Sequence, residues 1–255
     1  REVLKVVKET VVPLTLLGNG SNVLVRDKGI RGIVIKLGNM LRHFYEAEDL
    51  LVFGSGYSLA LASYKAMECG KTGMEFAVGI PGSIGGAVYM NAGAYDGEMQ
   101  NIVNCVKVMD LQGNERVLTA EELNFGYRKT SLQNSGLIVT EVTLKMPSGD
   151  KDEIKSKMDD FSHRRISKQP LEMPSAGSMF KRPPGYFAGT LIDQAGLKGY
   201  TVGGAQISTK HAGFVVNVGG ATAADVLQLI KDVQTKIKAG VGVELQPEVL
   251  VIGEE

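Results

Sequence analysis

The sequence predicts an α+β protein of two domains. Short apolar runs alternate with glycine-containing turns through the first half of the chain, a pattern that indicates strands. Longer stretches instead place their apolar residues at helical spacing. The composition changes at residues 147–150, which read PSGD. We therefore expect one domain over residues 1–149, with two lobes of about residues 1–53 and 54–149, and a second domain over residues 150–255.

The elements of the first domain follow from these patterns. Residues 2–9 read as the tail of an amphipathic helix, and residues 58–69 as a helix that ends at Gly70, a residue common at helix C-termini. Strands are predicted at residues 14–17, 23–25, 33–37, 50–53, 103–111, 116–118 and 137–146. In the last run, apolar and polar residues alternate over part of its length, as in a half-buried strand.

The second domain is predicted to begin with a charged helix at residues 151–168. A segment rich in proline and glycine follows at residues 169–189, and then a strand at residues 213–218. Residues 223–238 have helical spacing, with Thr222 as N-cap and Asp225 three positions later. The chain then ends in a largely apolar run at residues 241–252.

Composition limits the classes of function. The chain has 255 residues, with 28 Lys and Arg against 28 Asp and Glu, so no overall field attracts nucleic acid or a membrane surface. Cys69 and Cys105 form no disulfide framework and no CxxC pair. With no signal-peptide pattern and no long apolar run, we expect a cytoplasmic protein. The chain starts within a helical pattern and without Met, so we expect it to be truncated at its front.

The stretch GIPGSIGGAVYMNAG at residues 79–93 contains five glycines and no charged residue. Glycine lets a ligand approach the main chain, and successive main-chain N–H groups bind phosphates. A second patch, LGNGSN at residues 17–22, lies between two strand-like runs. Two such turns suit a dinucleotide diphosphate, although ordinary tight turns have the same composition. Neither patch has the spacing of a Rossmann motif or a P-loop.

Four other segments place polar groups in apolar or glycine-rich surroundings: residues 126–131, 175–183, 210–213 and 244–249. Taken singly, each is also compatible with a solvated surface residue or a helix cap. His163 and His211 have no second ligand at metal spacing, and no GxSxG elbow is present, so we expect neither a metal site nor a serine hydrolase.

Six motifs, in this order, make the chain resemble the UDP-N-acetylenolpyruvoylglucosamine reductases, a family of flavoenzymes. They are LGNGSNVLVRDKGIRGIVI (17–35), AVGIPGSIGGAVYMNAGAY (77–95), GYRKTS (126–131), PSAGSMFKRPPGYFAG (174–189), LIDQAGLKGYTVGGAQIS (191–208) and PEVLVIG (247–253). The resemblance runs over nearly the whole chain. Six motifs in family order are far more specific than any one of them.

The resemblance implies a two-lobed FAD-binding fold of the vanillyl-alcohol-oxidase (PCMH) type, followed by an α+β substrate-binding domain. It implies NADPH-dependent reduction of UDP-N-acetylglucosamine enolpyruvate (UDP-GlcNAc-enolpyruvate) to UDP-N-acetylmuramate through FAD, in peptidoglycan precursor synthesis. The cofactor-binding residues that it implies are Gly18, Asn19, Gly20, Ser21, Asn22, Gly79, Pro81, Gly82, Ser83, Gly85, Gly86, Ala87, Asn91 and Ile138.

The resemblance also assigns three catalytic residues. Ser178 matches the proton donor to the enolate-like carbon that forms when hydride is added. Arg128 matches the arginine near the substrate carboxylate, and Glu248 matches the carboxylate that helps to stabilise the intermediate. The candidate substrate-binding residues are Tyr127, Lys181, Arg182 and Tyr186.

The chain departs from the family pattern at several positions. Gln246 and Leu250 replace an acid and an arginine found in many members, and Arg182 stands where some members have asparagine. Only six residues, 185–190, separate the FKRPP and LID segments, so the chain resembles the shorter subclass, which lacks an insertion with a substrate-closing tyrosine. Members have about 40 further residues before the point where this chain starts.

Two alternatives stay open at this stage. One is another flavin-dependent oxidoreductase of the same fold that acts on a sugar or alcohol. The other is a non-catalytic module that binds a nucleotide sugar. Many oxidases of this fold attach flavin covalently, but His43, His163 and His211 lie in no tether motif, so we expect non-covalent FAD. We expect no nucleic-acid, membrane or obligate protein partner.

Overall fold

The computed structural model describes all residues from Arg1 to Glu255. The chain forms two compact units. Unit 1 contains Arg1–Asn19 and Gly32–Arg164, and unit 2 contains Gly20–Arg31 and Arg165–Glu255. This division differs from the expected boundary after residue 149 in two places, because the segment at 20–31 belongs to unit 2 and most of the helix after residue 150 belongs to unit 1.

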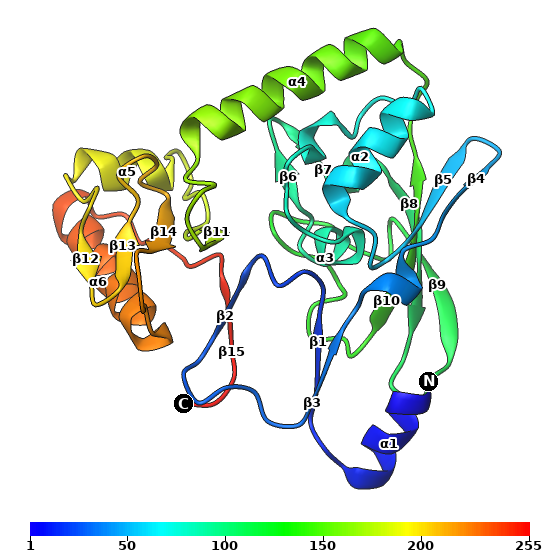
Figure 1. Cartoon of the computed structure of the whole chain (residues 1–255), viewed down its shortest axis with the longest axis horizontal. Helices are drawn as coiled ribbons and strands as arrows, with labels where there is room; N and C mark the ends of the chain where they lie inside the picture. The colour runs from blue at the N-terminus through cyan, green and yellow to red at the C-terminus, as the bar shows by residue number, and fades with distance from the viewer. The chain divides into compact units, whose positions relative to one another are not determined.

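Unit 1 is built on an antiparallel five-stranded sheet (Figure 1). Its strands, in spatial order, are β4 (Phe44–Ala47), β5 (Leu50–Gly54), β10 (Ile138–Lys145), β8 (Val103–Met109) and β9 (Glu115–Thr119). The predicted strands at 50–53, 103–111, 116–118 and 137–146 are confirmed within a few residues at their ends. Central strand β10 buries Val142 and Leu144, whereas Lys145 is exposed, in keeping with the predicted alternation.

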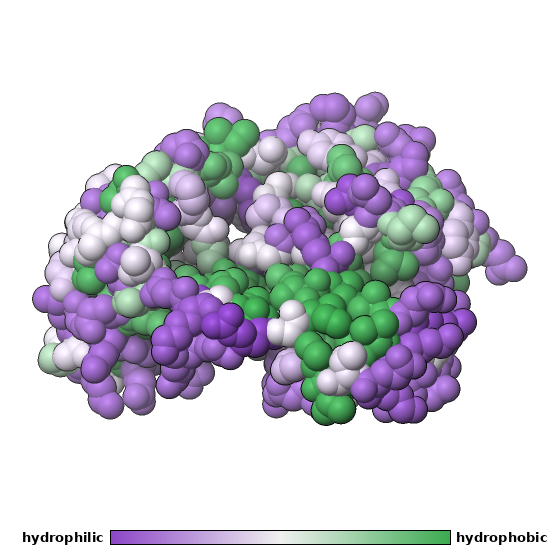
Figure 2. Space-filling view, turned by 60° about the horizontal axis from the view of Figure 1, so that its bottom comes forward, coloured by the Kyte–Doolittle hydropathy of each residue, from purple (hydrophilic) through white to green (hydrophobic).

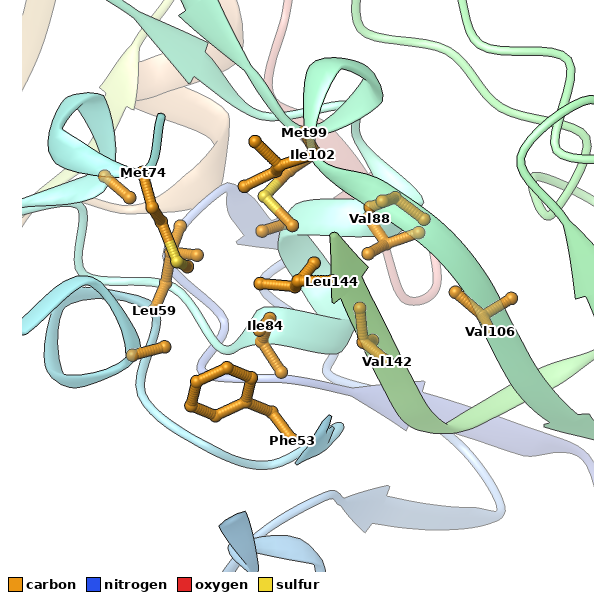
Figure 3. Close-up of a cluster of buried hydrophobic side chains, with 14 of the residues drawn as sticks. Phe53, Leu59, Met74, Ile84, Val88, Met99, Ile102, Val106, Val142 and Leu144 are labelled. Atoms are coloured by element: carbon orange, nitrogen blue, oxygen red, sulfur yellow. The ribbon is translucent and has the colours of Figure 1, made fainter. Parts of the chain in front are cut away.

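Two helices, α2 (Leu59–Glu68) and α3 (Ile84–Tyr89), supply apolar side chains to the core of unit 1. The Ser58 hydroxyl accepts a hydrogen bond from Leu61 N and caps α2. Figure 3 shows part of the resulting core, formed by Phe53, Leu59, Met74, Ile84, Val88, Met99, Ile102, Val106, Val142 and Leu144. This close packing fixes where α3 and the glycine-rich loop before it lie on the sheet.

Helix α4 (Lys151–Lys168) confirms the predicted charged helix. Its apolar side chains Ile154, Met158 and Phe161 are buried in one cluster with Val78, against which Tyr95 also packs. The rings of Tyr95 and Phe161 stack at 4.4 Å between centroids. This contact surface explains why the helix belongs to unit 1 as far as Arg164.

The N-terminal part of unit 1 contains α1 (Glu2–Thr10) and a parallel pair of strands, β1 (Leu14–Leu17) and β3 (Ile33–Lys36). All four residues of β1 are only half-buried, and Val34 of β3 is 42% exposed. Figure 2 shows hydrophobic side chains gathered on the face of the molecule that carries this pair. The shorter elements of the unit are β6 (Gly93–Ala94), β7 (Gly97–Glu98) and three 3₁₀ turns at Asn39–Leu41, Glu75–Ala77 and Met99–Asn101.

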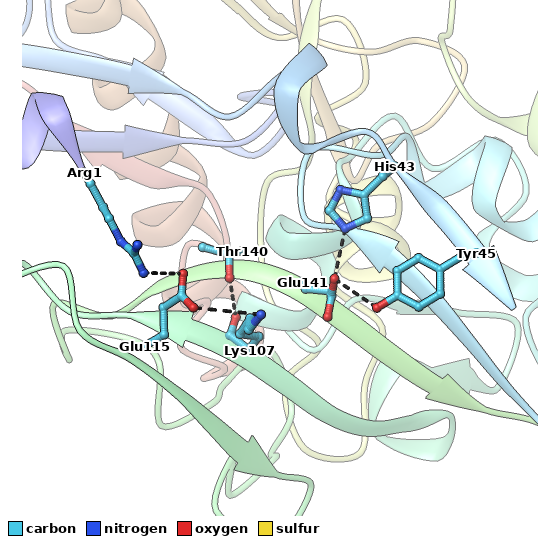
Figure 4. A network of polar contacts seen from close by, with 7 residues as sticks. All are labelled: Arg1, His43, Tyr45, Lys107, Glu115, Thr140 and Glu141. Carbon is cyan, nitrogen blue, oxygen red and sulfur yellow. Dashed lines mark hydrogen bonds and ion pairs between the residues drawn. The ribbon is translucent and has the colours of Figure 1, made fainter. Parts of the chain in front are cut away.

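Polar contacts link the central strand β10 to residues in and next to β4, and link Arg1 to the edge strand β9 (Figure 4). The Glu141 carboxylate on β10 lies 3.0 Å from His43 Nε2 and 3.4 Å from the Tyr45 hydroxyl. Arg1 pairs with Glu115 of β9 at 3.0 Å. Exposed ion pairs of this kind contribute about 1 kcal/mol or less, so the apolar core decides the fold of the unit.

Unit 2 contains an antiparallel four-stranded sheet of β11 (Ser175–Ser178), β14 (Phe214–Asn217), β13 (Ala205–Ile207) and β12 (Thr201–Val202). Helices α5 (Ala188–Gln194) and α6 (Ala223–Val241) pack with this sheet around one core. Helix α6 confirms the predicted helix and its start, since Thr222 and Asp225 form a capping box. Even the long helices of the chain lack the apolar length that is needed to cross a membrane.

The segment at residues 20–31 joins unit 2 through main-chain and side-chain contacts. Strand β2 (Val23–Val25) pairs in parallel with β15 (Leu250–Ile252), and Leu24 packs on the core of the unit. The Asp27 carboxylate accepts hydrogen bonds from Ala223 N at 2.7 Å and Ala224 N at 2.9 Å. Asp27 thus caps the N-terminus of α6, a helix that starts almost 200 positions later in the sequence.

Candidate active site

The first glycine-rich turn presents a row of unpaired main-chain donors. The N–H groups of the five residues after β1 donate to no group of the chain: Gly18, Asn19, Gly20, Ser21 and Asn22. Gly20 has φ +71°, a conformation that residues with a Cβ rarely adopt. Consecutive amides in a turn form a concave anion-binding surface. The turn therefore has the donors that a diphosphate requires.

The second glycine-rich loop has fewer available donors than its composition suggests. The amides of Ile84 and Gly85 donate to the carbonyl oxygens of Tyr57 and Ser55, and Gly86 N donates to the Ser83 hydroxyl. Fewer N–H groups therefore remain for a ligand, because α3 and the neighbouring loop already use several of them. The amides of Gly82 and Ser83 have no acceptor within the chain.

The two glycine-rich turns meet in unit 1. A Cβ atom on Gly18 would overlap the Ser83 hydroxyl, so glycine is needed for this approach. The side-chain amide of Asn19 donates to the Pro81 carbonyl oxygen at 3.0 Å and fixes the contact. The structure thus brings Gly18 and Asn19 beside the part of the second patch that still has unpaired amides.

The other residues expected at the cofactor differ in exposure. Gly79 and Pro81 are exposed at the surface of the loop, whereas Gly86 is half-buried. Gly85, Ala87 and Ile138 are buried, so that any cofactor contact by them stays a prediction. The Asn91 side chain is fully buried and its polar atoms bond within the chain, which leaves no side-chain group for a cofactor.

Arg128 lies on a tight turn in unit 1. Gly126 and Lys129 exchange main-chain hydrogen bonds across this turn, and Arg128 has φ +55°. Its guanidinium donates to the carbonyl oxygen of Asn91 at 3.4 Å and to that of Gly93 at 3.0 Å. A positive φ at a residue other than glycine is strained by about 1 kcal/mol or more and is found at functional sites.

Tyr127 lies beside the side chain of Arg128, and Gln133 binds its main chain. The guanidinium lies 5.0 Å from the centroid of the half-exposed Tyr127 ring. The Gln133 side-chain amide donates to the Arg128 carbonyl oxygen at 3.1 Å and to that of Tyr89 at 3.2 Å. Sequence reasoning missed Gln133, because no motif signals a side chain that acts on the main chain five positions earlier.

The segments of Ser178 and Glu248 come together in unit 2, although the two residues are 70 positions apart along the chain. Ser178 ends β11, and Glu248 N donates to the carbonyl oxygen of Met179, the next residue, at 2.8 Å. Lys181 N donates to the Gln246 carbonyl oxygen at 2.8 Å, and Phe180 pairs with Pro247. The two predicted catalytic segments therefore run side by side. Ser178 is exposed, and Glu248 is half-buried.

The second half of the first glycine-rich turn lies beside this pair of segments. The Asn22 side-chain amide donates to the Glu248 carbonyl oxygen at 3.2 Å, and Leu250 N donates to the Asn22 carbonyl oxygen at 3.0 Å. Gly177, with φ +80°, approaches the Ser21 carbonyl oxygen closely enough that an added Cβ would lie 3.9 Å from it. Residues expected to bind cofactor therefore contact the segments expected to carry catalysis.

The candidate substrate-binding residues of unit 2 lie on the loop that follows β11. The Arg182 guanidinium lies 3.9 Å above the centroid of the exposed Phe187 ring. Tyr186 is 48% exposed, and Lys181 is half-buried. These two cations and the aromatic side chains suit an anionic ligand with a planar ring.

Two family models match the sequence. The FAD binding domain matches residues 1–119, and the C-terminal domain of UDP-N-acetylenolpyruvoylglucosamine reductase matches residues 169–252. A UDP-N-acetylenolpyruvoylglucosamine reductase of Clostridium perfringens is 52% identical over 252 residues, which cover 99% of this chain and 83% of the relative. One of Geobacillus thermodenitrificans is 50% identical over 254 residues, which cover 100% of this chain and 83% of the relative.

A solved structure is also similar along nearly the whole chain. The crystal structure of UDP-N-acetylenolpyruvylglucosamine reductase from Thermus caldophilus has a TM-score of 0.83 and 40% sequence identity. The similarity covers 97% of this chain and 88% of that chain. These matches confirm the expected fold class, an FAD-binding fold followed by a C-terminal α+β domain.

Proposed function

This chain belongs to the UDP-N-acetylenolpyruvoylglucosamine reductase family, and we propose that it reduces the enolpyruvyl group of UDP-GlcNAc-enolpyruvate with NADPH, through FAD, to give UDP-N-acetylmuramate. The chain is thus an FAD-dependent oxidoreductase of peptidoglycan precursor synthesis. The observation that carries the proposal is the hydrogen-bonded pairing of the Ser178 and Glu248 segments within a chain that matches the family from end to end.

The main chain of unit 1 fits the cofactor. The unpaired amides of Gly18 and Asn19, together with those of Gly82 and Ser83, supply donors for the FAD diphosphate. Once reduced by NADPH, the bound flavin supplies the hydride that the enolpyruvyl group accepts. The protein orients the reacting groups and supplies the electrostatic environment for this transfer.

Ser178 supplies the proton in this proposal. Addition of hydride to the terminal carbon of the enolpyruvyl group leaves the neighbouring carbon with the character of an enolate. A serine hydroxyl is a weak acid, but the enolate of a carboxylate is a strong base, so transfer needs close geometry rather than a shifted pKa. The exposed position of Ser178 at the end of β11 supports this role, because substrate can reach its hydroxyl.

Arg128 and Glu248 act on the charge that develops. The planar guanidinium of Arg128 pairs with the substrate carboxylate and offsets the negative charge of the enolate. Glu248 helps to stabilise the same intermediate from the segment beside Ser178. The arrival of Arg128 at the same double bond as Ser178 and Glu248 is part of the proposal.

Substrate binding is assigned to the exposed side chains around these segments. Lys181 and Arg182 contact the phosphates or the carboxylate of the substrate, and Tyr186 stacks on the uracil or the sugar. Tyr127, which lies beside Arg128, contacts the enolpyruvyl end. The short link at residues 185–190 leaves no room for a longer closing segment at this point.

We place the reaction in the cytoplasm because its two small-molecule substrates, NADPH and a nucleotide sugar, are made and used there. The balanced charge of the chain, with 28 basic and 28 acidic residues, gives no general attraction to nucleic acid or to anionic lipid. The proposal therefore includes no macromolecular partner.

An absorbance spectrum and an NADPH oxidation assay test the function. The purified protein should show a flavin spectrum and should oxidise NADPH rapidly only when the enolpyruvyl sugar nucleotide is present. S178A should retain flavin and lose about a hundredfold or more in turnover. A protein that takes up no FAD would be a binding module, and yellow colour in an acid-precipitated pellet would indicate a covalent-flavin oxidase.

A further inference from the structure

Asn91 is a buried polar residue with no place in the function described above. Its side chain is completely buried, and its φ of +42° lies in the left-handed region, where asparagine is one of the few tolerated residues. The side-chain amide nitrogen donates to Glu98 Oε2 and to the Gly126 carbonyl oxygen, both at 3.0 Å. The side-chain oxygen accepts a hydrogen bond from Gln100 N at 3.0 Å.

These bonds connect Asn91 to the Arg128 turn at two points. The side chain of Asn91 holds the carbonyl oxygen of Gly126, the residue at which the turn begins. The main-chain carbonyl oxygen of Asn91 accepts a hydrogen bond from Arg128 Nη1, while Gly93, two residues on, accepts one from Nη2. One residue therefore contacts both the base of the turn and the functional group at its tip.

We propose that Asn91 is a positioning residue that fixes the guanidinium of Arg128, rather than a contact to FAD. The inference rests on the proposed function, in which Arg128 pairs with the substrate carboxylate. The site requires two donors and one acceptor on a short side chain, together with a positive φ, and asparagine meets all of these needs.

Aspartate shows why the amide matters. It has nearly the same size, but its carboxylate would face the Glu98 carboxylate and the Gly126 carbonyl oxygen, where Asn91 now donates. The contact with residue 98 can be restored separately, because a glutamine at position 98 would donate a hydrogen bond to an aspartate at position 91. The double variant N91D/E98Q therefore restores the contact between residues 91 and 98 and leaves the contact to Gly126 broken.

The experiment compares wild type, E98Q, N91D and N91D/E98Q as purified, FAD-loaded proteins. Stopped-flow absorbance separates flavin reduction by NADPH from flavin reoxidation by the enolpyruvyl substrate. Hydrogen–deuterium exchange reports on peptides that cover residues 126–131, in which the amides of Gly126 and Lys129 are bonded within the turn and that of Ser131 donates to the Leu123 carbonyl oxygen. Thermal unfolding reports on global stability.

We expect N91D and N91D/E98Q to slow reoxidation by about ten- to a hundredfold, because a misplacement of about 1 Å can have effects of this size. Reduction by NADPH should change less than threefold. Exchange at 126–131 should rise in both variants, whereas the loss of thermal stability in N91D should be largely recovered in N91D/E98Q. E98Q should stay close to wild type in the exchange at 126–131.

Two results would overturn the inference. One is a double variant that reoxidises as fast as wild type, and the other is unchanged exchange at 126–131 in both variants. If N91D does not fold, the double variant carries the same test, since it restores the contact to residue 98 and leaves the contact to Gly126 broken. If wild type itself does not turn over, the proposed function fails, and the exchange data still decide whether Asn91 fixes the turn.

Discussion

The side-chain amide of Asn22 donates a hydrogen bond to the main-chain carbonyl oxygen of Glu248 at 3.2 Å, across 226 positions of sequence. A residue in the turn expected to bind FAD thereby holds the segment that carries the carboxylate proposed to stabilise the intermediate. The reverse bond from Leu250 N to the Asn22 carbonyl oxygen makes this contact a two-point one. Asn22 and Glu248 thus lie at fixed positions with respect to each other inside one compact unit.

Replacement of Asn22 by alanine should therefore lower turnover more than it lowers FAD affinity. One buried hydrogen bond is lost, and we expect a decrease in kcat of about tenfold from the displaced Glu248 segment. N19A is the matched variant, because Asn19 holds the Pro81 carbonyl oxygen instead and should mainly weaken FAD retention. Equal loss of FAD and equal turnover per bound flavin in both variants would contradict this division of roles.

Substitution of Arg128 by lysine should not be conservative. The guanidinium donates to two carbonyl oxygens and, in the proposed function, to a carboxylate, whereas an ammonium group is a point charge without the planar fork. We expect the reoxidation of reduced flavin by substrate to slow by about a hundredfold, with flavin reduction by NADPH retained. Rates near those of wild type in R128K would remove the fork from the mechanism.

The contact between the two glycine-rich turns can be tested with a pair of variants. G18A should lose about 1–3 kcal/mol of stability and should bind FAD less tightly, because the new Cβ overlaps the Ser83 hydroxyl. Adding S83A should recover part of both losses, since the Ser83 Cβ lies 3.7 Å from the new atom, an ordinary contact. Urea unfolding and flavin fluorescence titration measure the coupling, and strict additivity would argue against the overlap.

His211 should make the stability of unit 2 depend on pH. Burial lowers the pKa of this imidazole below its ordinary value of 6.5, and the positive charges of Lys198 and Lys168 lower it further. The unfolded chain then binds a proton that the folded chain does not, so stability is present above pH 6.5 and is lost as the pH falls below it.

Urea unfolding at pH 8 and pH 5.5 measures this dependence. H211N is the matched control, because asparagine does not titrate and can still accept the hydrogen bond that Gly213 N donates to His211 Nδ1 at 3.1 Å. The loss of stability on acidification should be smaller in H211N than in wild type. The same loss in both proteins would assign the effect to other groups.

Removal of the Asp27 carboxylate should destabilise unit 2. D27A leaves the amides of Ala223 and Ala224 at the start of α6 without their acceptor, and the loss of such a cap costs about 1–2 kcal/mol. D27N, which keeps one side-chain oxygen as acceptor, should lose less. Chemical denaturation followed by circular dichroism measures both, and a D27A protein as stable as wild type would show that water replaces the cap.

Local patterns predicted the local structure well. The capping box at Thr222 and Asp225, the full length of α4 and the central strand β10 were all visible as spacing or composition. Strand β4 was not predicted, because its sequence FYEA has neither alternation nor a sustained apolar run. It forms because β5 offers it an edge to pair with.

Contacts between distant segments were beyond the reach of these patterns. Nothing near Asp27 indicates a helix that starts almost 200 positions later, and nothing near Asn91 indicates that its amide is needed at Gly126. Glycine content predicted two turns with available main-chain amides but not which amides are already used by α3. The family resemblance supplied the candidate catalytic residues, whereas the structure shows how the segments of Ser178 and Glu248 become neighbours.

The pairing of β2 with β15 affects how the protein folds while it is synthesised on the ribosome. Leu250 is the partner of Val23, so β2 is synthesised more than 200 residues before the strand with which it pairs. In the meantime its apolar residues and the carboxylate of Asp27 have no partners. This segment therefore needs protection by chaperones that bind nascent polypeptides for longer than segments with nearby partners do. A product whose translation stalls or terminates early would expose the segment permanently.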